Sequence, residues 1–92
     1  MNGTELITQE RERQIFTENF KPAHDDNLTD GQLADMAICY LNADDGVVLA
    51  GFWPGVINDE WFKSTTRIRD LVKAGALIAA EIDRLLRAGE QP

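Results

Sequence analysis

The sequence predicts an all-α protein, a small bundle of three main helices with a long aromatic-rich connection before the long C-terminal helix. Two observations carry this prediction: an apolar pattern with helical spacing from Ser64 to Arg87, and a helix-start signal at Thr29 that opens a second such pattern. No internal repeat, low-complexity stretch or domain boundary appears. We therefore expect one helical domain over residues 1–92.

The segment from Ser64 to Arg87 is the longest helical pattern, and we expect the rest of the chain to be organised around it. Ser64, Thr65 or Thr66 can cap its first turn, and Gly89 is typical of a residue that ends a helix. A helix of about 22 residues is about 33 Å long, so one short helix cannot cover it. Its expected buried stripe consists of Ile68, Leu71, Val72, Gly75, Ile78, Ala79, Ile82, Leu85 and Leu86.

A first helix is predicted from about Thr4 to Glu18, with Thr4 as its cap. Its apolar stripe is thin and consists of Leu6, Ile7 and Ile15. Between them, on the same face, lie the polar residues Glu10, Arg11 and Gln14. Because a buried charge is costly unless it is paired, these side chains meet partners elsewhere, meet a ligand or lie in water.

The second helix is predicted to follow a loop over residues 19–28, where Pro22 prevents helix continuation. Thr29 and Gln32 have the spacing of a capping box, flanked by Leu28 and Leu33 as a hydrophobic staple. The helix should end within residues 42–46. Its expected core face consists of Leu33, Met36, Ala37, Tyr40 and Leu41, with the hydroxyl of Tyr40 needing one hydrogen-bond partner.

The connection from Val47 to Phe62 contains both tryptophans and two of the four phenylalanines. A short strand over Val47–Ala50 is a possible element, and Pro54-Gly55 indicates a turn. Large aromatic side chains in such a connection either fill the core or line a pocket.

Composition excludes several classes of protein. The formal charge of -7 opposes attraction to phosphate backbones and so disfavours nucleic acid as a main partner. Cys39 is the only cysteine, which excludes an intrachain disulfide and a cysteine-cluster zinc site. No signal peptide and no apolar run of about 18 residues appears, so we expect no membrane association and a cytoplasmic location.

Catalytic signatures are absent from the sequence. There is no GxSxG elbow, no phosphate-binding glycine loop, and no Glu-x-x-Glu or Glu-x-x-Asp pair to hold magnesium. His24, Asp25 and Asp26 could ligate a metal, but consecutive residues seldom do so alone, and a hydrogen-bonded loop is the alternative. We therefore expect a non-catalytic protein without a cofactor.

Basic residues are concentrated around the start of the C-terminal helix. Lys63, Arg67, Arg69 and Lys73 lie close together with only Asp70 among them. Such a cluster favours an anionic ligand, although a solvated basic face has the same pattern. The residues expected to bind such a ligand are Arg11, Arg13, His24, Lys63, Arg69 and Lys73, with Trp53 and Trp61 as stacking surfaces.

Several segments together resemble a mostly uncharacterised family of small proteins from phages and bacterial prophages. The likeness covers nearly the whole chain: Glu10-Arg11, Arg13-Gln14-Ile15, Pro22, His24-Asp25-Asp26, Trp53-Pro54, Trp61, Lys63 and the run from Arg69 to Ile78. The chain differs from the family motif at Asn19, Phe20, Phe62, Ser64 and Ile68. The resemblance implies a phage origin and a host-cytoplasmic location, and assigns no biochemical activity.

These observations lead to three hypotheses of function. The first is a phage or prophage accessory protein that sequesters an anionic, nucleotide-derived defence signal. The second is an inhibitor that binds a host defence protein directly, and the third is a degenerate magnesium-dependent nucleotide pyrophosphohydrolase. We also expect a homodimer or higher oligomer built on the C-terminal helix, with Leu85 and Leu86 in or near the contact.

Overall fold

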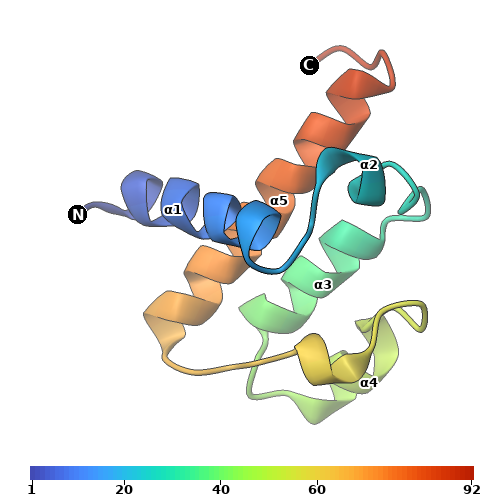
Figure 1. The fold of residues 1–92 in the computed structure, drawn as a ribbon. Helices are drawn as coiled ribbons and strands as arrows, with labels where there is room; N and C mark the ends of the chain where they lie inside the picture. Colours follow the sequence, from blue (N-terminus) through green and yellow to red (C-terminus); the bar gives the residue numbers. More distant parts are fainter.

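The computed structural model describes all 92 residues and contains helices and connections only (Figure 1). Its elements are α1 (Gly3–Phe16), α2 (Pro22–Asp25), α3 (Gln32–Leu41), α4 (Gly46–Phe52), the 3-10 helix η1 (Asp59–Trp61) and α5 (Arg67–Arg87). The predicted all-α bundle is confirmed. α1, α2 and α3 all pack against α5, and Figure 1 shows α1 crossing α5 near its middle.

α5 forms where the helical pattern predicts it. Among the three candidate caps it is Thr66 whose side chain accepts a hydrogen bond, from the N–H of Arg69 at 3.1 Å. Gly89 follows the helix with φ +94°, as expected of a residue that ends one. The 21 residues give a length of about 32 Å. α5 is thus nearly as long as the molecule, whose longest dimension is 35 Å.

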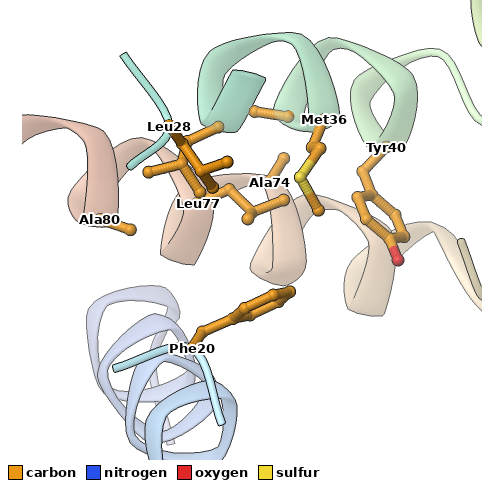
Figure 2. Packing of buried hydrophobic residues seen from close by; sticks show 9 residues of the cluster. Phe20, Leu28, Met36, Tyr40, Ala74, Leu77 and Ala80 are labelled. Atoms are coloured by element: carbon orange, nitrogen blue, oxygen red, sulfur yellow. The ribbon is translucent and has the colours of Figure 1, made fainter. Parts of the chain in front are cut away.

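The core lies where α3 packs along α5 (Figure 2). Met36 and Tyr40 of α3 face Ala74 and Leu77 of α5, and the ring of Phe20 approaches the same two residues from the opposite side. Small side chains on α5 let the two backbones approach closely. Cys39 and Tyr40 are buried, as predicted.

The predicted buried stripe of α5 is largely wrong. Of the nine residues predicted to be buried, only Val72 is buried, and most of the large ones face solvent. The core is instead built on Leu77 with Ala74, Ala76 and Ala80, because α1 and α3 pack against the smallest side chains rather than the most apolar ones. The small residues of α5 are thus covered by helices of the same chain. The exposed residues, here called the exposed stripe, are Ile68, Leu71, Ile78, Ile82 and Leu86.

The predicted capping box of the second helix does not form. α3 begins at Gln32, after Gly31 in the left-handed conformation (φ +79°), and no side chain caps it. The Gln32 side chain instead accepts from the N–H of Asp30 at 2.7 Å. Leu28 and Leu33 are both buried, so core packing, and not the local capping signal, determines how the chain enters the helix.

Two further elements differ from the sequence prediction. The candidate strand at Val47–Ala50 is part of α4, because the side chain of Asp45 accepts from the N–H groups of Val47 and Val48 and caps a helix there. The cap of α1 is Asn2, two residues before the predicted Thr4, and it forms a capping box with Glu5. The loop before α3 contains the short helix α2.

Candidate functional site

The inward face of α1 carries a buried carboxylate. Glu10 is 2% exposed and Gln14, one turn later, is 4% exposed. Glu10 accepts hydrogen bonds from Nε and Nη2 of Arg13, at 2.9 and 2.8 Å, and from Nη2 of Arg69 at 2.7 Å. The polar face predicted for the first helix is therefore buried, and its acid pairs with cations from α1 and α5.

This pairing keeps Glu10 ionised. Burial alone raises the pKa of the Glu10 carboxyl, but the hydrogen bond and charge of Arg13, with the charges of Arg69 and Lys73, outweigh it and lower the pKa below the ordinary 4.5. Three N–H donors of the two arginines occupy the carboxylate oxygens, and Nε2 of Gln14 donates a longer bond at 3.5 Å. Glu10 thus holds two guanidinium groups in place and has little free capacity to accept a proton from a substrate.

A cavity of about 390 Å³ lies beside this ion cluster. Four cationic side chains line it with only two carboxylates, in a chain whose overall charge is -7. Its size is that of a small-molecule site. The residues lining this central cavity are Glu10, Arg13, Gln14, Glu18, Phe20, Met36, Tyr40, Trp61, Lys63, Thr65, Arg69, Lys73 and Leu77.

Two of the lining cations retain donors for a ligand. The side chain of Lys63 forms no ion pair within the chain, and Arg69 uses only Nη2, toward Glu10. Lys73 is more constrained, because its ammonium donates to the carbonyl of Lys63 and lies 5.6 Å from the centre of the Tyr40 ring. Burial lowers the pKa of Lys73, although Glu10 and Asp70 oppose that effect.

Aromatic rings form another part of the cavity wall. Trp61 and Phe20 have ring centroids 4.7 Å apart. The hydroxyl of Tyr40 donates to the carbonyl of Trp61 at 3.1 Å and accepts from the N–H of Lys63 at 3.2 Å, which supplies the partner that this buried group requires. Tyr40 therefore fixes the segment that carries both Trp61 and Lys63 at the cavity.

The start of α5 is held against the same segment by a buried acid. Asp70 is 4% exposed and accepts from Oγ of Ser64 at 2.8 Å and from the N–H of Thr65 at 3.1 Å. These bonds position Thr65 beside Arg69 in the cavity wall. The acid within the basic cluster thus orders the chain that leads into α5.

The structure brings five of the eight predicted ligand residues to the central cavity: Arg13, Trp61, Lys63, Arg69 and Lys73. The other three, Arg11, His24 and Trp53, do not line it. Arg11 donates to the buried carboxylate of Asp25 at 2.8 Å. Trp53 packs against Tyr40 and Phe62, and its indole N–H donates to the carbonyl of Ile57 at 3.0 Å.

The residues of the candidate metal site have other contacts. Asp25 pairs with Arg11, Asp26 pairs with Arg87 at 2.8 Å, and the ring of His24 lies 5.4 Å from that of Phe20. No group of three or more His, Cys, Asp or Glu side chains comes together in a way that could hold a metal ion. The geometry here is that of a hydrogen-bonded loop.

Sequence reasoning missed several residues of the cavity. Glu18 was predicted at the end of the first helix and Thr65 as a candidate cap, but both lie in connections outside the helices and line the cavity. Met36 was predicted only as a core position and Leu77 was not predicted to be buried, yet both are buried and border the cavity.

Comparison with protein-family models, with curated proteins and with solved structures finds no match to this chain. None of its helices is both long enough and apolar enough to cross a bilayer.

Proposed function

We propose that the central cavity binds a small anionic ligand that carries a phosphate group next to an aromatic ring, as a nucleotide-derived molecule does. The observation that supports this most directly is the concentration of four of the nine basic residues around one cavity in an acidic chain. Guanidinium and ammonium donors suit phosphate oxygens, and the indole of Trp61 offers a stacking surface for a base.

The biological role we propose is that of a non-catalytic phage or prophage accessory protein that sequesters such a signal from the host defence. Support comes from the resemblance described above and from Glu10, whose oxygens are occupied by arginine donors. A magnesium-dependent pyrophosphohydrolase is the catalytic alternative, and measurable pyrophosphate release from nucleoside triphosphates would establish it.

Calorimetry with a panel of linear and cyclic nucleotides tests the binding proposal. Lys63→Gln should weaken binding of any nucleotide that binds by about five- to tenfold, because it removes an unpaired ammonium at the cavity. The matched control is Lys21→Gln, which removes the same charge from an exposed position outside the cavity. Absence of heat with every nucleotide would reject the proposal.

The alternative partner is a host protein bound through the acidic surface. With four of the nine basic residues at the cavity, acidic side chains outnumber basic ones on the rest of the surface. Co-purification of one host protein at a fixed ratio, unaffected by Lys63→Gln, would favour direct inhibition over ligand sequestration.

We also propose that two copies associate through the exposed stripe of α5. On a helix with 3.6 residues per turn, the stripe lies opposite the positions of Arg69, Lys73 and Leu77, which face the cavity. A two-fold contact through the stripe therefore leaves both cavities open.

A further inference from the structure

Glu18 holds Arg13 at the edge of the central cavity. Its Oε1 accepts from Nη1 of Arg13 at 2.7 Å, and both side chains are partly exposed, at 28% for Glu18 and 40% for Arg13. Glu18 also lines a shallower hollow that adjoins the cavity and includes Glu60, Trp61 and Lys63. Glu18 thus lines both the central cavity and this hollow.

The two carboxylates that contact Arg13 are held very differently. The side chain of Glu10 has no exposed area and accepts two N–H groups of Arg13 as well as one from Arg69. The Glu18 carboxylate accepts a single hydrogen bond, and Glu18 lies beyond the end of α1, next to Asn19 with φ +64°. Glu10 is therefore a fixed anchor for Arg13, whereas Glu18 can be exchanged for another anion.

We propose that Glu18 is an internal competitor of the ligand: in the free chain its carboxylate occupies the position on Arg13 Nη1 that a phosphate oxygen takes when the ligand binds. This inference rests on the proposed function, and it describes how a residue of the chain limits ligand binding at the cavity. The incoming oxygen replaces one oxygen acceptor by another on the same N–H donor, and Lys63, which lines both hollows, is placed to pair with the same anion. Arg13 stays in position throughout because Glu10 holds its other two nitrogens.

The strength of the Arg13–Glu18 pair limits the size of the effect. Partly exposed ion pairs are weak, so a ligand can displace Glu18 at small cost, and removing this competitor should tighten binding by about two- to fivefold. The same weakness means that Glu18→Gln should fold normally, because Glu10 retains its own bonds to Arg13.

The test compares Glu18→Gln with Glu60→Gln in calorimetric titrations with inorganic pyrophosphate and with the tightest nucleotide of the panel, at constant ionic strength. Glu60 is the matched control, because it lines the same shallow hollow, carries the same charge and forms no ion pair. We expect Glu18→Gln to bind about threefold tighter than the wild type, and Glu60→Gln to change affinity much less.

Two results would overturn the proposal. One rejects only the competition by Glu18, and the other also rejects the proposed binding function. If the wild type binds but Glu18→Gln is no tighter than Glu60→Gln, Glu18 does not compete, and the binding function stands. If neither the wild type nor Glu18→Gln binds pyrophosphate or any nucleotide, the competitor and the proposed function are both rejected.

Discussion

Ile7 of α1 lies directly over Gly75 of α5. A methyl group built on Gly75 would come within 2.6 Å of Cδ1 and 2.9 Å of Cγ1 of Ile7. α1 can cross α5 this closely because no side chain intervenes. One turn further along α1, the crossing places Glu10 within reach of Arg69.

Gly75→Ala should therefore destabilise the fold by about 1 kcal/mol, because overpacking against Ile7 exceeds the gain in helix propensity. In an Ile7→Ala background the clash is absent, and the same change should be neutral or stabilising by up to about 1 kcal/mol. Urea unfolding of the four variants measures this cycle. Equal effects of Gly75→Ala in both backgrounds would mean that contact with Ile7 does not determine the effect of this change.

Arg11→Ala should destabilise the fold by about 3 kcal/mol, since it leaves the fully buried carboxylate of Asp25 without its cation. The neighbouring change Glu12→Ala, at an exposed position, should alter stability by less than about 0.5 kcal/mol. Melting temperatures and urea midpoints give both values. Comparable losses in the two variants would show that the Arg11–Asp25 pair contributes little.

Acid should weaken the fold through Glu10. Its pKa is lower in the folded chain than the ordinary 4.5, so the unfolded chain binds more protons in this range. The stabilisation is fully present above about pH 5 and is lost as the pH falls through the lowered pKa. Unfolding free energies measured from pH 7 downward should fall less steeply for Glu10→Gln than for Glu12→Gln. Parallel curves for the two variants would exclude Glu10 as the source.

The proposed dimer predicts a measured mass of twice 10.3 kDa at tens of micromolar. Because Leu85 is half-buried within the chain, Ile78 and Ile82 in the exposed stripe are better positions for disruption than the sequence-predicted pair Leu85 and Leu86. Ile78→Asp with Ile82→Asp should give a monomer that keeps its helical circular dichroism, since it places charges in the contact and not in the core. Light scattering that finds a monomeric wild type would rule the assembly out.

Helical periodicity was sufficient to predict the fold class and the location of α5, but not the face that α5 buries. An apolar stripe identifies residues that favour burial, whereas close helix packing here selects Ala74 and Ala80 because they are small. The capping signal at Thr29 failed for a related reason. Burying Leu28 and Leu33 together fixes a backbone path that starts the helix after Gly31.

The candidate site was predictable to the extent that it lies on helices. Glu10 and Gln14 are four residues apart, so the pattern of the first helix placed them together on its inward face. Arg13 and Arg69 could be proposed as cations from the sequence. That both bind Glu10 depends on α1 crossing α5 at Gly75, and no local sequence pattern predicts that crossing. His24 was proposed as a cation and hydrogen-bond donor for the ligand, but it lies outside the cavity.

The pairing of Glu10 with Arg69 joins residues 59 positions apart, and Arg87 reaches back 61 positions to Asp26. During synthesis, α1 leaves the ribosome long before the helix that completes its ion cluster. Until α5 docks, Glu10 has only Arg13 from its own helix, and no cavity exists between α1 and α5. The central cavity therefore forms only when α5 docks, and contacts of such long range make that step slow relative to the formation of each helix.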